Sequence, residues 1–574
     1  MFRFMMKTIT TQKVNCKDCH RCVRICPVKA IGIVEGHAEL VNEKCILCGR
    51  CVVECPQHAK QANDMTQAIL RARDDGRPLV LSLAPSFIAA FPDYSITGLV
   101  EEIRSIGFHA AEETAVGAEV VSALYRELVD ETHQPVISSC CPVIVNLLER
   151  YYPAMIDYLA PVRSPMLVHG ELLRKRYGRN AFIVFAGPCI AKLEECDWDD
   201  SQIDAAITFP QLRALFAYHA PADQMAAPGS GFLDQQVGPA RFFPVKGGVI
   251  RSFMVGDETD VDIFSVSGIE DCMEVFEDIA SGVIRPRFVE AMACKGGCIG
   301  GPTMGIEQCK PIKRKRVIQY AAHEASHQPE VSKTVCLNDY RRTFVARPFL
   351  QCKPTEAQIR DILRHIGKTS SADEKNCGAC GYNTCREKAI ATFQGLAEPA
   401  MCVPYMRSKA ESFANLIVDN SANAIIVVDE DMTVQEFNPA AENLFHIDKL
   451  AMVGQSLATV IDCSDFIKAA ESGEKVPRQV VAYSRYDVIT ERIIIPVKEH
   501  GFIFGVFNDI TENEAHRHEL AMLKKDTVDK ATEIINKQMQ VAQEIAGLLG
   551  ETTAETKATL LELITVLNTK GEDR

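Results

Sequence analysis

The chain lacks the segments that would place it in or across a membrane. Its longest apolar stretch, near residues 78–92, is interrupted by serine and proline, whereas a spanning helix needs about 20 consecutive apolar residues. The first residues contain no apolar core and no cleavage site of a secretory signal. No long basic block is present, and the net charge is −14. We therefore expect a cytoplasmic protein without a membrane span and without a nucleic-acid partner.

Cysteine, in contrast, is abundant. The 574 residues include 23 cysteines, and 47% of the chain is hydrophobic, which is enough for several packed domains. Most of these cysteines lie in C-x2-C runs, not in the scattered pairs of a secreted disulfide protein. Thiols at such spacing indicate metal binding in a reducing compartment, and hence an oxygen-sensitive protein.

The N-terminal cysteines form two runs with the spacing C-x2-C-x2-C-x3-C-P, 29 residues apart. In this pattern three thiolates of one run hold one 4Fe–4S cube, and the fourth reaches the other cube. A zinc site is the alternative, but zinc does not account for the third cysteine or for the repeated Cys-Pro ending. We therefore predict a ferredoxin domain with two 4Fe–4S clusters over residues 1–65. The expected ligands are Cys16, Cys19, Cys22 and Cys55 for one cube, and Cys45, Cys48, Cys51 and Cys26 for the other.

The middle of the chain alternates continuous apolar segments with amphipathic ones. Strands are expected near 79–83 and 182–186, and helices near 97–106, 117–130 and 143–152. Apolar strands interleaved with helices predict an α/β domain with buried parallel strands. Cysteine motifs lie close to the ends of these strands, where α/β folds place their sites.

Three cysteine motifs in this region carry the chemistry. They are Ser139-Cys140-Cys141-Pro142, then Gly187-Pro188-Cys189-Ile190-Ala191-Lys192, then Met292-Ala293-Cys294-Lys295-Gly296-Gly297-Cys298. Thiolates from three distant segments can hold one iron–sulfur cube. In this order the motifs resemble the H-cluster domain of the iron-only (FeFe) hydrogenases, over residues 77–365. The resemblance implies that Cys141, Cys189, Cys294 and Cys298 bind the cube.

The same resemblance implies a di-iron centre that carries CO, cyanide and a bridging dithiolate amine, joined to the cube through Cys298. It assigns Cys140 as the proton relay to that amine, and Lys192 as the partner of one cyanide. The remaining residues that match the family's site are the acidic Glu195 and the segment Ala84-Pro85-Ser86, which faces the other cyanide. Phe243 matches the family's aromatic wall, and Met292 matches its methionine near the bridging CO.

Two motifs depart from the family pattern. Gly187-Pro188-Cys189 replaces Met-Pro-Cys, and Ser164-Pro165-Met166 replaces Ser-Pro-Gln. Leu124 lies near the position of the first of two glutamates in the family's proton channel. Such changes should alter redox potential, inhibition and turnover more than cluster assembly, and similar ones occur in the sensory branch of the family. An iron–sulfur scaffold without the di-iron unit is the alternative for this domain.

A second iron–sulfur domain is expected over residues 370–408. A polar stretch at 367–375 marks the boundary, and four cysteines with the spacing C-x2-C-x4-C-x16-C follow it. They resemble a small 4Fe–4S domain found in corrinoid-protein partners and in some hydrogenases, and zinc remains the alternative. A cube here offers an electron exit towards the C-terminus. The expected ligands are Cys377, Cys380, Cys385 and Cys402.

The last third begins with strands expected at 424–428 and 434–437, followed by a helix that Asn438 caps and Pro439 opens. Further strands are expected near 478–485, 491–497 and 502–508. This order resembles a PAS sensor domain over residues 410–512, with a generic α+β interaction domain as the alternative. No haem or flavin signature is present, so the PAS ligand is unassigned.

A helical tail is expected over residues 513–574. Residues from Val528 to Leu549 repeat at alternating spacings of three and four, with Gln538 as the polar position, which is a short heptad seam. The seam predicts a homodimer or a docking helix, and an amphipathic helix packed on the PAS domain is the alternative. The whole chain is thus expected to be multidomain, α/β and α+β.

The leading hypothesis is a hydrogen-sensing FeFe hydrogenase. It would split dihydrogen reversibly and relay its redox state through four 4Fe–4S clusters to the PAS domain. A catalytic, ferredoxin-linked hydrogenase is the first alternative, and a non-enzymatic scaffold is the second. The expected partners are dihydrogen and protons, a ferredoxin-like electron partner, maturation proteins and a downstream signalling kinase or phosphatase.

Overall fold

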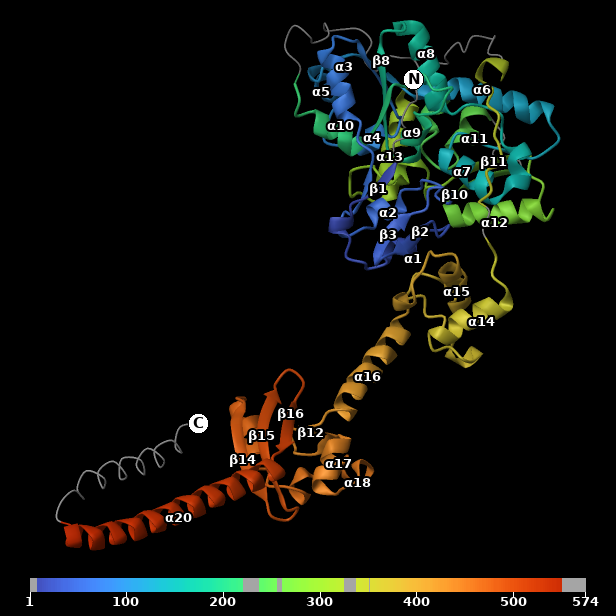
Figure 1. Cartoon of the computed structure of the whole chain (residues 1–574). Helices are drawn as coiled ribbons and strands as arrows, with labels where there is room; N and C mark the ends of the chain where they lie inside the picture. Colours follow the sequence, from blue (N-terminus) through green and yellow to red (C-terminus); the bar gives the residue numbers. More distant parts are fainter. Residues whose placement is uncertain (1–7, 220–236, 255–260, 325–336, 350–351, 550–574) are drawn as a thin grey trace. The chain divides into compact units, whose positions relative to one another are not determined.

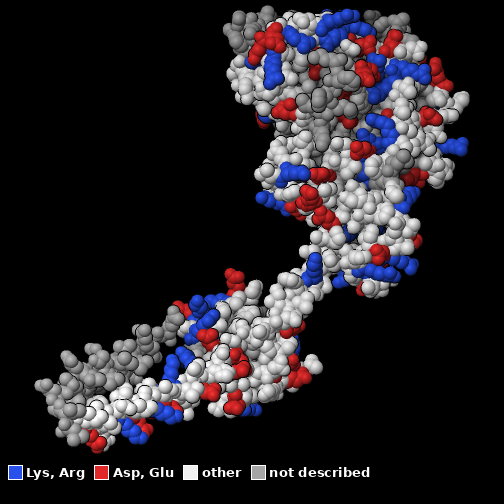
Figure 2. All heavy atoms as spheres, viewed as in Figure 1, with Lys and Arg blue, Asp and Glu red and all other residues white. Residues whose placement is uncertain are grey.

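The chain divides between Met406 and Arg407 into two units, each described here by itself (Figure 1). The computed structural model describes residues 8–219, 237–254, 261–324, 337–349 and 352–549. Among the described helices, none combines the length and the apolar character that crossing a bilayer requires. On the face that Figure 2 shows, acidic and basic side chains are interspersed over both units.

The N-terminal cysteine runs lie within two small antiparallel sheets and two short helices. Each helix begins inside a cysteine run, directly after a residue with positive φ: His20 in the first run and Gly49 in the second. The two halves therefore repeat one loop-and-helix form, as the repeated spacing predicts. The elements are β1 (Ile9–Thr11) paired with β4 (Lys60–Ala62), β2 (Ile31–Val34) paired with β3 (His37–Leu40), α1 (Arg21–Ile25) and α2 (Arg50–Val53).

Two parallel sheets form the centre of the first unit. The larger has the strand order β6-β5-β8-β9, and the smaller has the order β10-β11-β7. All their pairings are parallel, which confirms the predicted α/β architecture. The strands are β5 (Leu79–Leu83), β6 (Phe108–Glu113), β7 (Val136–Ile137), β8 (Phe182–Gly187), β9 (Ala205–Thr208), β10 (Ile263–Ser267) and β11 (Phe288–Met292).

Helices pack around these sheets (Figure 1). The three helices predicted near 97–106, 117–130 and 143–152 are present as α5, α6 and α7, with ends within two residues of the prediction. The bounds are α3 (Thr66–Asp74), α4 (Phe87–Ala90), α5 (Ile96–Ser105), α6 (Ala115–Glu131), α7 (Pro142–Tyr151), α8 (Pro165–Tyr177), α9 (Ala191–Glu195), α10 (Phe209–Leu215), α11 (Gly248–Phe253), α12 (Ile269–Ala280) and α13 (Lys310–Glu324).

The strand order explains where a site can form. The chain leaves β5 towards β6 on one side, and β8 and β9 continue the sheet on the other side. A crevice opens at the carboxyl ends of the strands where the order reverses in this way. Both β5 and β8 end here, because their carboxyl ends pair in register through Leu83 and Ala186.

A small hydrophobic core of its own accompanies Cys377, Cys380, Cys385 and Cys402 at the end of the first unit. Thr355 and Thr384 cap its two helices by accepting backbone N–H groups. Ile359, Leu363 and Ala389 pack together in its interior. The elements are α14 (Glu356–His365), α15 (Cys385–Phe393) and the short 3-10 helix η8 (Pro399–Met401); α16 (Val403–Asp419) then crosses the division between the units.

The second unit is built on a five-stranded antiparallel sheet with the order β13-β12-β16-β15-β14. Asn438 caps the helix after the second strand by accepting the N–H of Ala441 at 3.0 Å, as predicted. The elements are β12 (Ala424–Asp429), β13 (Val434–Phe437), α17 (Pro439–Phe445), α18 (Lys449–Met452), α19 (Ser464–Ser472), β14 (Val476–Tyr483), β15 (Val488–Val497), β16 (Phe502–Asp509) and α20 (Thr511–Leu549).

Aromatic side chains fill the space between this sheet and its helices. Phe445 meets Phe507, Tyr483 and Tyr486 at ring distances of 5.7, 5.7 and 5.3 Å. Phe437 and Phe466 are also fully buried. The interior of this unit is therefore a packed aromatic core.

The tail forms one helix, α20. The described side chains between Ala515 and Ile545 are exposed or half-exposed, including Ile545 at 51%. The alternative in which this helix packs along the PAS domain is therefore wrong for this stretch. The heptad seam stays a prediction, and the expected tail beyond Leu549 lies outside the described residues.

The contact between α6 and α8 provides a test of this packing. A Cβ at Gly117 would lie 2.4 Å from the Pro165 carbonyl oxygen and 2.8 Å from the His169 backbone nitrogen. We expect Gly117→Ala to lower the free energy of unfolding by about 1–3 kcal/mol, because the helices would have to separate. Urea unfolding of the apoprotein measures this change in the free energy of unfolding.

Gly98→Ala is the matched control, because Gly98 is also helical and its Cβ would meet only the Ser95 hydroxyl at close range, at 3.2 Å. Alanine should be neutral there or stabilise by up to about 1 kcal/mol. Equal effects at both glycines would contradict the close helix contact.

Candidate functional site

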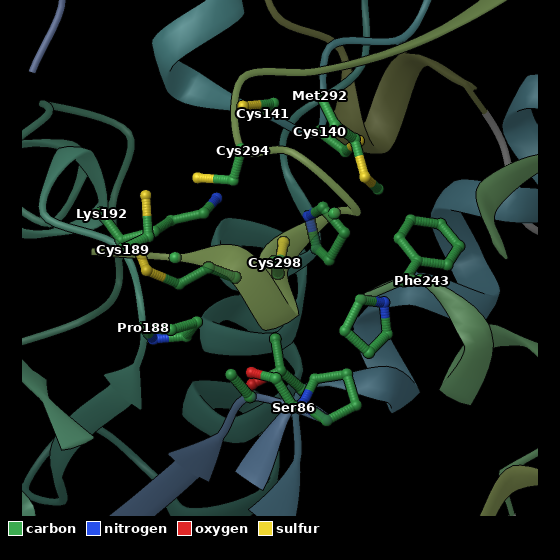
Figure 3. Close-up of a pocket in the computed structure, with 18 of the residues that line it drawn as sticks. Ser86, Cys140, Cys141, Pro188, Cys189, Lys192, Phe243, Met292, Cys294 and Cys298 are labelled. Atoms are coloured by element: carbon green, nitrogen blue, oxygen red, sulfur yellow. The ribbon is translucent and has the colours of Figure 1, made fainter. Parts of the chain in front are cut away.

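The strand ends of both sheets converge on one cavity. β5 leads into Ala84-Pro85-Ser86, β8 into Pro188-Cys189, β7 into Ser138–Cys141, and β11 into Ala293-Cys294. The cavity between them has a volume of about 110 Å³ and an almost wholly apolar lining. The predicted site residues that line it are Pro85, Ser86, Cys140, Cys141, Cys189, Lys192, Phe243, Met292, Cys294 and Cys298 (Figure 3).

Four of the cavity's thiols are the predicted cube ligands. Burial and the charges of neighbouring thiols raise the pKa of Cys294 and Cys298 well above the ordinary thiol value. Burial and Cys141 likewise raise the pKa of Cys189 to about 12. Thiols this close repel one another once ionised, and a bound metal removes the repulsion by taking them as thiolates.

Lys192 brings a positive charge to this apolar cavity. Its ammonium donates to Ser164 Oγ at 2.7 Å and to the Glu195 carboxylate. Glu195 itself is 2% exposed and does not line the cavity. The structure therefore places Glu195 behind Lys192, where it holds the ammonium in position, and not at the cavity surface.

Cys140 lines the same cavity as the four proposed ligand thiols but is not itself a proposed ligand. Burial, and then the charges of Cys141 and Glu290, raise its pKa to about 12. The thiol therefore carries its proton at neutral pH. A protonated sulfur at the cavity wall suits a group that passes protons to a neighbour.

The residues present fit an anionic group in this cavity. Ser86 Oγ is buried without a hydrogen-bond partner among the described residues, and Ser86 lines the cavity. A Cβ at Gly297 would lie 2.5 Å from the Pro244 carbonyl oxygen, and one at Gly301 would lie 2.6 Å from that of Pro188. The glycines thus let the ligand loops pack tightly, while Ser86 and Lys192 offer donors.

The two departures from the family pattern have different structural outcomes. A Cβ at Gly187 would meet the Phe185 ring at 2.7 Å, so Phe185, which lines the cavity, occupies the space beside this glycine. The aromatic ring therefore compensates for the missing side chain. Met166 is buried at the cavity wall and its side chain has no N–H or O–H group, so no donor replaces the expected glutamine there.

Sequence reasoning missed Glu290, a buried carboxylate next to the cavity. It accepts N–H groups from Gly247 at 2.6 Å and Ile250 at 3.1 Å, and the hydroxyl of Ser265 at 3.0 Å. These bonds fix the loop that carries Phe243. The available signal was an acidic residue inside the apolar strand Phe288–Met292.

Several of the ferredoxin cysteines lie near one another. Burial, and the charges of neighbouring thiols that include Cys26, raise the pKa of Cys45 to about 12 and of Cys48 to about 11. Cys26 therefore lies with the second run. Burial raises the pKa of Cys22, with smaller contributions from Cys16 and Cys19. Cys55 accepts the N–H of Ala59 at 3.3 Å, and its place in the first cube stays a prediction.

The C-terminal cysteines also surround one hollow. A small cavity is lined by Cys377, Cys380, Cys385 and Cys402, together with Lys368 and Lys388. Lys388 is 1% exposed, and burial lowers the pKa of its ammonium. A buried cation beside four thiols suits an anionic metal–thiolate centre.

Family models match four parts of the chain. Residues 77–302 match the iron only hydrogenase large subunit, C-terminal domain. This chain carries an iron-only hydrogenase large-subunit domain. Residues 15–60 match a 4Fe-4S dicluster domain, 373–404 match an Fe-S cluster domain, and 413–488 match the PAS fold. The predicted domain types are therefore confirmed, while their exact bounds stay predictions.

Individual relatives are distant. The NADP-reducing hydrogenase subunit HndD of Solidesulfovibrio fructosivorans is 26% identical over 50% of this chain and 63% of its own. Iron hydrogenase 1 of Clostridium pasteurianum is 25% identical over 62% of this chain and 75% of its own. The cytosolic Fe-S cluster assembly factor NAR1 of Encephalitozoon cuniculi is 22% identical over 50% of this chain and 83% of its own. The similarity therefore includes hydrogenases and an assembly factor.

The proposed cube ligands can be tested by iron content. Cys189→Ser should remove one 4Fe–4S cube, and hence about four iron atoms per chain, from anaerobically reconstituted protein. Cys196→Ala is the control, because Cys196 is fully buried outside the cavity lining. Iron and sulfide analysis measures both. Equal iron content in the two variants would contradict Cys189 as a ligand.

Proposed function

We propose that the protein is a hydrogen-sensing FeFe hydrogenase. It splits dihydrogen reversibly at an H-cluster in the cavity and relays its redox state through iron–sulfur clusters to the PAS domain. The observation that carries the proposal is the joint lining of one cavity by Cys140, Lys192 and Ser86 together with the four thiols. These three residues are not needed to hold a cube.

The cofactors would be four 4Fe–4S clusters and a di-iron unit with CO and cyanide ligands, which supplies the heterolytic splitting of dihydrogen. Cys141, Cys189, Cys294 and Cys298 would hold the cube of the H-cluster. Maturation proteins would have to supply the di-iron unit. The PAS ligand stays unassigned.

The surrounding side chains have distinct proposed roles. Cys140 Sγ would hold and pass the proton, while the Lys192 ammonium and the Ser86 hydroxyl would serve as donors to the anionic ligands of the di-iron unit. Glu195 keeps Lys192 oriented through its ion pair. Pro85, Phe243 and Met292 line the cavity with apolar surface and exclude water, which strengthens each of these polar contacts.

The sensing role is supported by the domains that accompany the hydrogenase domain. A PAS domain and a 39-residue helix follow it in the sequence. Met166 also removes a donor from the cavity wall, which favours altered turnover. A downstream kinase or phosphatase would read the signal, and the predicted heptad seam of α20 would offer a dimer contact.

A catalytic hydrogenase linked to a ferredoxin-like electron partner is the second candidate. Cys140 favours it, because a proton relay serves rapid turnover. In that case the PAS domain would regulate an enzyme instead of reporting on hydrogen.

A non-enzymatic iron–sulfur scaffold is the third candidate, and the similarity to a cluster assembly factor favours it. It would hold the cubes without the di-iron unit. Infrared bands of CO and cyanide in matured protein would then be absent.

Substitution of Cys140 separates proton transfer from assembly. We expect Cys140→Ala to lower hydrogen oxidation by about 10²–10⁴-fold, the usual contribution of a positioned acid–base group. Iron content should be unchanged, because Cys140 is not a proposed ligand. Dye reduction under hydrogen measures the rate, and Cys272→Ala, another buried thiol, is the control. Loss of iron in Cys140→Ala would contradict the ligand assignment.

The sensing role predicts a hydrogen-dependent change in the second unit. Matured full-length protein should turn over near or below about one per second, the low end for enzymes. Amide hydrogen exchange in residues 407–549 should differ between hydrogen and argon. Cys140→Ala should lose most of this difference. Rates of hundreds per second with unchanged exchange would favour the catalytic candidate instead.

A further inference from the structure

The C-terminal Fe–S domain, residues 373–404, packs on the ferredoxin module. Figure 1 shows α15 next to α1 and β2 within the first unit. The backbone N–H of Ile33 donates to the Leu396 carbonyl at 3.0 Å, and that of Gly36 donates to the Glu398 carboxylate at 3.2 Å. β2 is thus tied directly to the segment that follows α15.

Two basic side chains of the ferredoxin module extend this contact to the loop that carries Cys380. Lys29 donates to the Gly381 carbonyl at 2.7 Å, and Arg24 donates to the Ala379 carbonyl at 3.1 Å. Both acceptors lie beside the predicted ligand Cys380. Each of these cations also bonds carbonyls of its own module, so both loops are held together.

Apolar packing continues between these hydrogen bonds. Tyr382 is 4% exposed and belongs to the same hydrophobic core as Val23 and Cys26. A Cβ at Gly381 would lie 2.9 Å from Val23 Cγ1. Tyr382 and Gly381 therefore lie in the packed contact between the two modules.

Another part of the ferredoxin module, around Cys48, contacts the hydrogenase domain. Cys48 is followed directly by Gly49 and Arg50, which both contact the hydrogenase domain. A Cβ at Gly49 would meet Ile190 and Pro302 of the hydrogenase domain at 2.7 and 2.8 Å. Arg50 also binds Glu270 of α12 through two hydrogen bonds. Cys48 and Cys26 thus point the proposed cube of Cys26, Cys45, Cys48 and Cys51 towards two different domains.

We infer that this ferredoxin cube is the branch point through which the C-terminal cluster exchanges electrons with the H-cluster, across the contact of Val23 and Cys26 with Gly381 and Tyr382. The inference rests on the proposed function and deepens it. The signal to the PAS domain passes through the ferredoxin module instead of leaving the hydrogenase domain directly. One electron leaves the branch-point cube and one enters the cube of Cys377, Cys380, Cys385 and Cys402; no bond is made and no proton moves.

Two glycines of the C-terminal domain allow a matched test. Both have positive φ, +94° at Gly381 and +71° at Gly395, so alanine strains the backbone at each. At Gly381 the new Cβ also meets Val23, whereas at Gly395 it meets nothing within 4 Å. Only Gly381→Ala should therefore loosen the contact between the modules.

The readout is the electron paramagnetic resonance of dithionite-reduced full-length protein, which requires no hydrogen turnover. In the parent protein the signal of the C-terminal cube should be split by a neighbouring reduced cube. A Cys377→Ser/Cys385→Ser variant identifies that signal by its loss. Gly381→Ala should lose the splitting with unchanged iron content, and Gly395→Ala should retain it.

Lys29→Met is a second variant, because it removes the bond to the Gly381 carbonyl without altering a glycine. It should also weaken the splitting. Retained splitting in both Gly381→Ala and Lys29→Met, or a C-terminal site that holds zinc, would overturn the branch point. Protein that shows the splitting but no hydrogen turnover would refute the proposed function, while the coupling between the ferredoxin cube and the C-terminal cube would remain supported.

Discussion

Four thiols that line one cavity are the constraint on which the first unit depends. Burial and the charges of neighbouring thiols raise the pKa of Cys189, Cys294 and Cys298 above the ordinary thiol value, so the protein alone favours the protonated form of these three. A metal cluster reverses this preference, and its binding then stabilises the fold that gathers the thiols. The loops that carry them come from two different sheets. Cluster binding and the packing of the two sheets are therefore energetically coupled.

The polar groups around this cavity divide into those that face it and those that support it. Cys140, Lys192 and Ser86 line the cavity. Glu195 and Glu290 are buried behind it and fix Lys192 and the Phe243 loop. Such supporting contacts orient the groups around a metal site and thereby tune it. The glycine at 187, which removes one wall residue, is compensated by Phe185 from the same strand.

The ferredoxin module connects two domains that are far apart in the sequence. Its Cys48 side faces the hydrogenase domain, and its Cys26 side faces Gly381 and Tyr382. Lys60 is buried within the ferredoxin module and donates to the Ala38 carbonyl at 2.8 Å. Burial raises the pKa of Cys22 and Cys51, and the positive charge of Lys60 opposes this rise. A buried cation near both runs favours the reduced state of clusters bound there.

The sequence by itself determined the local features: cysteine spacing, the buried parallel strands, the helices near the Cys140-Cys141 motif and the Asn438 cap. These follow from short-range periodicity and side-chain chemistry. The position of Glu195 behind Lys192, the replacement of the lost wall by Phe185, and the role of Glu290 required the tertiary structure, because each depends on how side chains pack around the cavity. The contact of residues 373–404 with the ferredoxin module was decided in the same way, since Lys29 and Gly381 are 352 positions apart. Spacing in a sequence specifies which residues can bind a cluster, but only packing specifies which clusters are neighbours.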